Sequence, residues 1–217
     1  MESVRRRVFL KGLAGAAGFA LATRVAPRSA RADELDDVLA RVASSRASLR
    51  TLVGPFTQVR KIGLLSSEVR STGVMTLVRP DRLRWELAAP DDVVYWITPE
   101  GLAYKSKNGQ GQVRGANARI AATLDDLRTV LAGDLGALRA RYDLRLVSSN
   151  ESGAAFEAVP RAGASAPVSR IAFSLASDLV RPVRATLVEG PRDRSDIIFG
   201  ELQRDAEVDP AIVRPPA

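Results

Sequence analysis

The chain has 217 residues, no cysteine, no histidine and a formal net charge of +7. These absences remove disulfides, thiolate chemistry, the commonest general base and the commonest metal ligand. Residues 1–32 contain seven basic residues and one acid, so residues 33–217 carry 25 basic and 24 acidic residues, a net charge of +1. The basic excess lies in the N-terminal segment, and a nucleic-acid-binding domain is not predicted.

The first 32 residues have the three regions of an export signal. A basic start is followed by a weakly apolar run at 12–23 and a small-residue site ending at Ala32. The string RRVFLK, which begins with Arg6 and Arg7, resembles the twin-arginine export motif. The apolar run of 12 residues is shorter than the roughly 17–25 needed to span a bilayer. We expect 1–32 to be a signal cleaved after Ala32, and 33–217 to be one domain exported to the periplasm.

The first half of this domain is predicted to be one helix followed by strands. Apolar residues recur at helical spacing over 34–49, which predicts an amphipathic helix lying on an apolar sheet face. Short alternating runs punctuated by Pro80, Pro90 and the pair Asn108-Gly109 predict an antiparallel meander. The expected strands are 53–62, 68–78, 83–87, 93–98, 102–105 and 112–114.

The pattern changes to helical in the middle of the chain. Leucines step by three and four up to Gly133, and Thr123 with Asp126 resembles a capping box, so this helix starts at 118 or 124. Asp134 then caps a short helix at 135–141. The remaining expected strands are 143–147, 154–159, 168–175, 180–189 and 195–202, with an irregular tail at 203–217.

The elements add up to about eleven strands and three helices, without an internal repeat or a linker. Successive strands joined by tight turns form an antiparallel sheet, and a sheet of that size curls or closes. We predict a mainly β (α+β) fold, a curved antiparallel incomplete β-barrel whose helices cover the concave side as a lid.

The order G-x-M-x-L-x-R-P-x-x-L-R-W-E-x-x-x-P from Gly73 to Pro90, together with Phe56-Thr57-Gln58, resembles the LolA-like periplasmic lipoprotein carriers. The resemblance implies the same incomplete barrel, with two short helices as a lid. It also implies acylated lipoproteins as cargo, an inner-membrane exporter complex that loads them and an outer-membrane acceptor. The family arginine that Arg79 matches hydrogen-bonds the backbone of the lid helices when the cavity is closed.

The candidate site is therefore an apolar cavity with Arg79 as the switch of the closed state. Without the resemblance, Arg79 is more typical of a solvated strand end, and aromatic residues such as Trp85 are typical of ordinary core. Inward positions follow the parity anchored on Met75 and Trp85, and a one-residue shift of register would invert them. The expected cavity residues are Met75, Leu77, Leu83, Trp85, Leu87, Val93, Tyr95, Leu124, Leu127 and Leu131.

Three functions fit these features. The first is a monomeric carrier that binds acyl chains of lipoproteins and moves them from the inner to the outer membrane. The second is a binding module or transporter for another lipid or glycolipid. The third, an enzyme acting on lipid or glycan, is disfavoured, because adjacent acids such as Asp91-Asp92 do not point at one site. No cofactor, metal or nucleic acid is expected.

Overall fold

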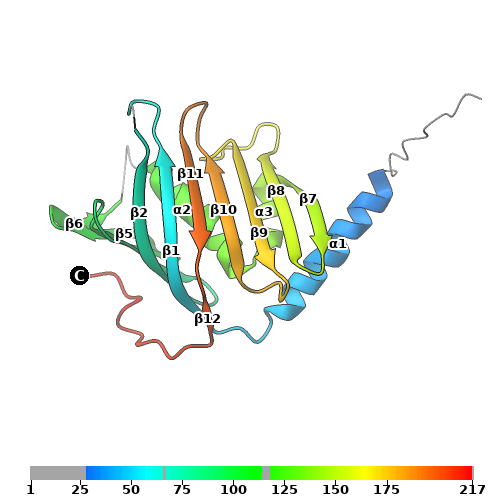
Figure 1. The fold of residues 1–217 in the computed structure, drawn as a ribbon, viewed down its shortest axis with the longest axis horizontal. Coiled ribbons are helices and arrows are strands. Elements are labelled where there is room, and N and C mark those ends of the chain that lie inside the picture. Colours follow the sequence, from blue (N-terminus) through cyan, green and yellow to red (C-terminus); the bar gives the residue numbers. More distant parts are fainter. Residues whose placement is uncertain (1–27, 66, 114–117, 217) are drawn as a thin grey trace, which may run out of the picture.

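The computed structural model describes residues 28–65, 67–113 and 118–216 (Figure 1). The expected twin-arginine motif with Arg6 and Arg7 lies outside these residues, as does Arg114. Helices α1 (Arg28–Ser45), α2 (Ala118–Ala132) and α3 (Leu135–Arg141) are present. The strands are β1 (Thr51–Lys61), β2 (Val69–Val78), β3 (Arg82–Leu87), β4 (Val93–Thr98), β5 (Gly101–Ser106), β6 (Gly109–Gln112), β7 (Tyr142–Asn150), β8 (Gly153–Pro160), β9 (Arg170–Ala176), β10 (Pro182–Val188), β11 (Arg194–Phe199) and β12 (Gln203–Arg204).

The twelve strands of the described residues form one antiparallel sheet in the order β6-β5-β4-β3-β2-β1-β11-β10-β9-β8-β7, with β12 paired to β1. Neighbours in this order are consecutive in the chain except β1 and β11, where the two halves of the chain meet. The end strands β6 and β7 do not pair with each other, so the barrel stays open. The predicted mainly β, open antiparallel fold is confirmed, with β12 as the strand beyond the expected eleven.

Helices α2 and α3 lie against one face of this sheet, and α1 lies beside its β7 edge (Figure 1). Each helix packs an apolar stripe into a common core, as the helical spacing of these residues predicts. The buried helix residues of this core are Leu35, Val38 and Val42 of α1, Leu127, Val130, Leu131 and Ala132 of α2, and Leu135 and Leu138 of α3.

The register of the meander places the predicted parity on the helix-covered face. Met75 pairs with Trp85, which pairs with Tyr95 on the next strand. Residues paired across antiparallel strands share a face, and alternate residues along each strand return to it. Met75 is fully buried and Trp85 is 1% exposed. In the structure, the residues of β2, β3 and β4 that were chosen as inward thus lie on the helix-covered face.

The outer face of the meander meets the C-terminal tail. The tail is irregular after β12, as expected, but it is attached to the sheet. Trp96 Nε1 donates a hydrogen bond to the carbonyl of Ile212 at 2.8 Å, and Val213 is 4% exposed. This contact explains why β4 carries the apolar Trp96 on its outer face.

Several expected element boundaries differ from the observed ones by two or more residues, among them the end of β11 at Phe199 rather than 202. Helix α1 spans Arg28–Ser45 rather than 34–49, because no glycine or proline interrupts that stretch. Ala32 therefore lies within a helix, and cleavage after it stays a prediction. The strand expected at 112–114 is β6, because Ser106 pairs with Gly109 across a two-residue turn. Strand β7 continues to Asn150 rather than ending at 147, through a bulge opposite β8.

The capping box expected at Thr123 and Asp126 does not form, because α2 begins at Ala118. The Asp126 carboxylate instead accepts a hydrogen bond from the hydroxyl of Tyr142. Asp134 caps α3 as predicted, accepting from the Ala137 amide at 3.0 Å. In the described part of the chain, the helices are too short or too polar to cross a bilayer.

Candidate binding site

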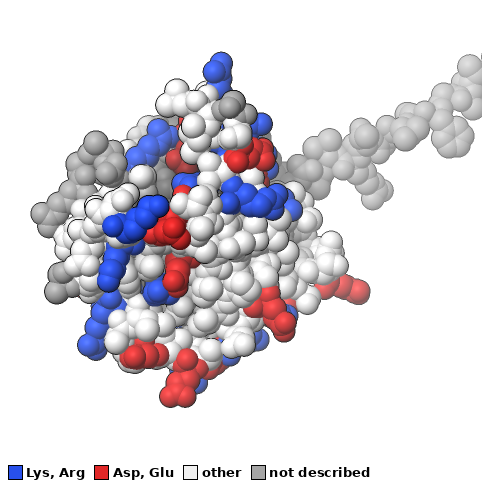
Figure 2. All heavy atoms as spheres, turned by 60° about the vertical axis from the view of Figure 1, so that its left-hand side comes forward, with Lys and Arg blue, Asp and Glu red and all other residues white. Residues whose placement is uncertain are grey.

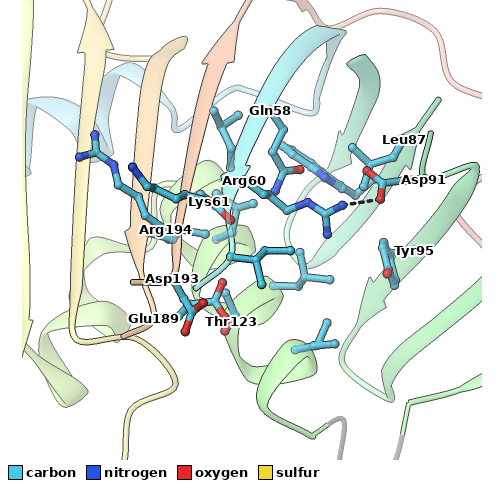
Figure 3. Close-up of a pocket in the computed structure, with 18 of the residues that line it drawn as sticks. Gln58, Arg60, Lys61, Leu87, Asp91, Tyr95, Thr123, Glu189, Asp193 and Arg194 are labelled. Atoms are coloured by element: carbon cyan, nitrogen blue, oxygen red, sulfur yellow. Dashed lines mark hydrogen bonds and ion pairs between the residues drawn. The ribbon is translucent and has the colours of Figure 1, made fainter. Parts of the chain in front are cut away.

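A cavity of about 300 Å³ lies between the inner face of the sheet and α2 (Figure 3). Its wall is mostly apolar, because the inward residues of β3, β4, β10 and β11 face the apolar stripe of α2. The apolar residues that line it are Ile62, Trp85, Leu87, Val93, Tyr95, Ile120, Leu124, Leu127, Leu187 and Ile197.

The expected cavity residues divide into two groups. Trp85, Leu87, Val93, Tyr95, Leu124 and Leu127 line the cavity. The other four belong to the packed core, where α2 and α3 lie directly on the sheet and leave no space: Met75, Leu77, Leu83 and Leu131. Only tertiary packing separates the two groups, since the strand residues of both groups have the same inward parity.

Trp85 forms the floor of the cavity. Its ring stacks on Phe56 with centroids 3.7 Å apart and meets the edge of Phe199 at 6.3 Å. Phe56 lies opposite Gly73, and Gly73 has no side chain that would occupy the space of the stacked ring. The floor is therefore a rigid aromatic surface rather than a flexible aliphatic one.

Polar side chains gather at one side of the cavity, where β1 ends and β11 begins. Arg60 Nη2 forms an ion pair with Asp91 Oδ1, and the Ser71 hydroxyl donates to Asp91 Oδ2 (Figure 3). We call the charged residues of this part the polar rim. They are Arg60, Lys61, Asp91, Glu189, Asp193 and Arg194.

The polar rim was not predicted from the sequence. Asp91 was interpreted as one of two adjacent acids that do not point at one site, and Thr123 as part of a helix cap, although both line the cavity. A signal for the strand residues was present, because Gln58 and Arg60 alternate with Phe56 and therefore share its inward face. No local signal joins Asp91 to Arg60, since they meet only when β1 and the β3–β4 turn fold together.

The rim carries three basic and three acidic side chains, so it has no net charge. Figure 2, which shows another face of the molecule, likewise has basic and acidic side chains interspersed. Burial raises the pKa of Tyr95; Arg60 opposes this shift, while Asp91 and Tyr104 add to it. The phenol therefore stays neutral and able to donate at physiological pH. The described residues contain no cluster of three potential Asp or Glu metal ligands.

Arg79 lies at the end of β2 and does not hydrogen-bond α2 or α3 in the described structure. Its Nη1 donates to the main-chain carbonyl of Arg46, in the turn after α1. Its own amide donates to the carbonyl of Arg50 at 2.9 Å. The direct contact with the lid backbone expected for Arg79 is therefore absent from the described contacts.

Arg46 makes the contact expected of Arg79. Its side chain is 1% exposed, and Nη1 donates to the carbonyls of Val130 at 3.3 Å and Leu131 at 2.9 Å. These carbonyls belong to the last turn of α2, which has no intrahelical donors for them. Nε and Nη2 donate to Leu179 and Val180 at 3.1 and 2.6 Å, between β9 and β10. Arg46 thus joins the C-terminal end of α2 to the sheet.

The Arg46 guanidinium stays charged despite this burial. Burial lowers its pKa from 12.5 to about 10; nearby Arg79 adds to the decrease and Asp178 opposes it. Gly133, which ends α2 as predicted, has a φ of +78° and leaves space that a β-carbon would take from Arg46. A fixed planar fork of donors suits four carbonyls better than a lysine ammonium would.

A second buried contact fixes the middle of α2. Asp126 is fully buried, accepts from the Tyr142 hydroxyl and forms an ion pair with Arg141. Burial raises the Asp126 pKa, and both partners oppose the shift. The Tyr142 pKa is raised by burial first and by Asp126 second. These groups hold α2 to the start of β7.

An open antiparallel sheet with a helix-covered apolar cavity is the architecture of a protein that binds apolar ligands. The chain belongs to the LolA family: the family model described as outer membrane lipoprotein carrier protein LolA matches residues 47–214. No match to a curated protein was found.

Several solved structures resemble this chain at low sequence identity. A DUF1329 family protein from Desulfovibrio piger is 10% identical with a TM-score of 0.51, over 85% of this chain and 97% of that one. The LolA superfamily protein NE2245 from Nitrosomonas europaea is 8% identical with a TM-score of 0.44, over 82% and 96%. A chain of the Pseudomonas aeruginosa MucA/MucB complex is 16% identical with a TM-score of 0.47, over 84% of this chain and 61% of that one.

Proposed function

We propose that the protein carries acyl chains of lipoproteins through the periplasm, from the inner to the outer membrane. The observation that supports this function is the apolar cavity covered by α2, in a chain of the LolA family. Each methylene buried from water contributes about 0.8 kcal/mol, so exposing two or three chains of about fourteen methylenes would cost on the order of 20–35 kcal/mol. A soluble route needs a protein that covers these chains.

The cavity must enlarge to hold such cargo. Its volume of about 300 Å³ lies at the lower end of ligand pockets, which span roughly 300–1,000 Å³. Helix α2 is held at its C-terminal end by buried Arg46, and at its N-terminal end by Arg119, which donates to the carbonyls of Pro167 and Glu189. The Arg119 bonds are exposed to solvent and the Arg46 bonds are buried, so we expect the N-terminal end of α2 to be the part that moves outward to admit cargo.

Arg79 supports the closed, empty state through the main chain of Arg46, which in turn binds α2. Arg79→Leu weakens closure, and we expect this variant to retain cargo longer than the wild type. An inner-membrane exporter complex would load the carrier and an outer-membrane acceptor would unload it, by analogy with the family. These partners are part of the proposal.

The twin-arginine motif supports a periplasmic location, because it is typical of proteins exported folded. Replacing Arg6 and Arg7 by lysine is expected to block export, measured by fractionating cells and detecting the uncleaved chain in the cytoplasm. Export of the variant at the rate of the wild type would contradict this route.

The carrier function is tested by incubating the purified protein with membranes that contain acylated lipoproteins. The wild type should withdraw lipoprotein into the soluble fraction. Leu124→Gln places an amide in the cavity wall and should reduce this withdrawal, whereas Val147→Gln, at a residue 65% exposed on β7, should not. A wild type that withdraws no lipoprotein would rule out the proposed function.

The small volume of the cavity favours a second candidate, a carrier of a single-chain lipid or glycolipid. Mass spectrometry of material that co-purifies with the protein from its own periplasm separates the two candidates. An acylated protein supports the lipoprotein carrier, and a free lipid supports the second function. We propose a binding role rather than an enzymatic activity, because the family model that the chain matches describes a carrier protein.

A further inference from the structure

Three polar atoms in the cavity wall are buried without a hydrogen-bond partner in the described structure. They are Gln58 Oε1, Arg60 Nε and Thr123 Oγ1. The side chains of Gln58 and Thr123 belong to residues 9% and 6% exposed. Buried polar groups are nearly always paired, since an unpaired one loses its hydration without compensation. Three such atoms around one cavity indicate a ligand that pairs with them.

Neighbouring polar side chains show that local partners were available. Thr129, on the same helix as Thr123, donates to the carbonyl of Asp125 one turn earlier at 2.9 Å. Ser71, opposite Gln58 in the register of β1 and β2, donates to Asp91. The Thr123 hydroxyl makes no such bond and stays available to the cavity.

The three atoms define the chemistry of the missing group. Arg60 Nε donates a hydrogen bond, Gln58 Oε1 accepts one, and the Thr123 hydroxyl can do either. A complementary group contains a carbonyl oxygen with a hydroxyl or an N–H beside it. Gln58 and Arg60 come from β1 and Thr123 from α2, so this group would bridge the sheet and the helix (Figure 3).

The charge of the polar rim excludes an ionised head. Arg60 is paired with Asp91, and Arg194 forms an ion pair with Asp196 at 2.6 Å. An anionic head would also face the carboxylates of Glu189 and Asp193. With no basic excess to compensate, burying such a charge is unfavourable. The matching group is therefore uncharged.

We propose that Gln58, Arg60 and Thr123 form a subsite for the linkage that joins an acyl chain to the rest of the bound ligand. The linkage is an uncharged ester or amide carbonyl with a hydroxyl or N–H beside it. The chain beyond it extends along the apolar wall towards Trp85. This inference rests on the proposed function, because it places the chain of the cargo in the same cavity.

The test separates chain binding from head binding. Diphenylhexatriene, a hydrocarbon dye without polar atoms that fluoresces in apolar surroundings, reports occupation of the apolar wall. Its displacement by monolauroylglycerol, N-lauroylethanolamine or laurate then reports binding of an ester, an amide or a carboxylate on the same chain. The variants are Gln58→Leu and Thr123→Val, with Thr129→Val as the matched control because its hydroxyl is already paired.

We expect the wild type to bind the two uncharged lipids roughly tenfold more tightly than laurate, as one or two additional hydrogen bonds allow. Gln58→Leu and Thr123→Val should still take up the dye but lose most of this preference, whereas Thr129→Val should keep the preference. A preference for the ester or for the amide identifies the linkage by which the natural ligand bears its acyl chain.

Two negative results have different meanings. Normal dye uptake with no preference for an uncharged head, or a preference that both variants keep, overturns the subsite and leaves the proposed function standing. A folded wild type that takes up neither dye nor lipid contradicts the proposed function as well.

Discussion

The most informative perturbation is Arg46→Met, which keeps the length of the buried side chain and removes its donors. The carbonyls of Leu131, Leu179 and Val180 would lose the partner that Arg46 supplies, whereas Val130 keeps a bond from the Gly133 amide at 3.1 Å. An unpaired buried carbonyl costs about 1–3 kcal/mol, so three cost about 6 kcal/mol at the middle of that range.

Part of this loss is recovered, because the variant no longer buries a charge. The decrease of the Arg46 pKa from 12.5 to about 10 corresponds to about 3 kcal/mol. The expected net decrease in the free energy of unfolding is therefore about 3 kcal/mol. For a domain of this size each kcal/mol changes the melting temperature by about 2–4 °C, so Arg46→Met should melt about 6–12 °C below the wild type.

Thermal and urea unfolding followed by circular dichroism measure this difference. The matched control is Arg50→Met, because the Arg50 side chain is 81% exposed and its ion pair with Asp205 is 4.0 Å long. Hydrogen exchange shows which part of the structure is destabilised: amides at the C-terminal end of α2 should exchange faster in Arg46→Met. An Arg46→Met variant as stable as Arg50→Met, with unchanged exchange in α2, would refute the assigned role.

Three further predictions concern stability. Burial raises the Asp126 pKa above 3.8, so the fold favours the protonated carboxyl. The free energy of unfolding of the wild type should therefore fall as pH rises through and above that value. Urea unfolding of Asp126→Asn over the same pH range should not show this decrease. Gly73→Ala, whose β-carbon would contact the carbonyl of Glu86, should lower the free energy of unfolding by about 1–3 kcal/mol, whereas Gly111→Ala should not. Trp96→Phe removes an indole donor to the tail and should cost about 1 kcal/mol and speed proteolysis of residues 205–216.

Each of these has a clear contrary result. Wild type and Asp126→Asn with parallel stability curves across acidic pH would mean that this carboxyl does not titrate differently in the fold. A Gly73→Ala variant of normal stability would show that the Phe56 ring and the strand can move apart. Unchanged proteolysis in Trp96→Phe would show that the tail is held by its apolar contacts alone.

The sequence alone determined the fold class and most of the inward face. Alternation with a period of two is a local property of a strand, so Leu83, Trp85 and Leu87 could be assigned to one side before any pairing was known. The helical stripe around Leu127 was determined in the same way. The ordered motif around Arg79 and Trp85 indicated the family, because residue types and their spacing can be read directly from the sequence.

Other features were decided only by the tertiary structure. Arg46 follows a helix without any motif, and its partners in α2 and before β10 are 84 or more positions away in the chain. Asp91 became a partner of Arg60 because a turn and the end of β1 come together in the curved sheet. Whether an inward side chain lines a cavity, as Leu87 does, or fills the core, as Leu77 does, depends on where α2 rests. Such contacts depend on distances between elements, and local periodicity carries no information about those distances.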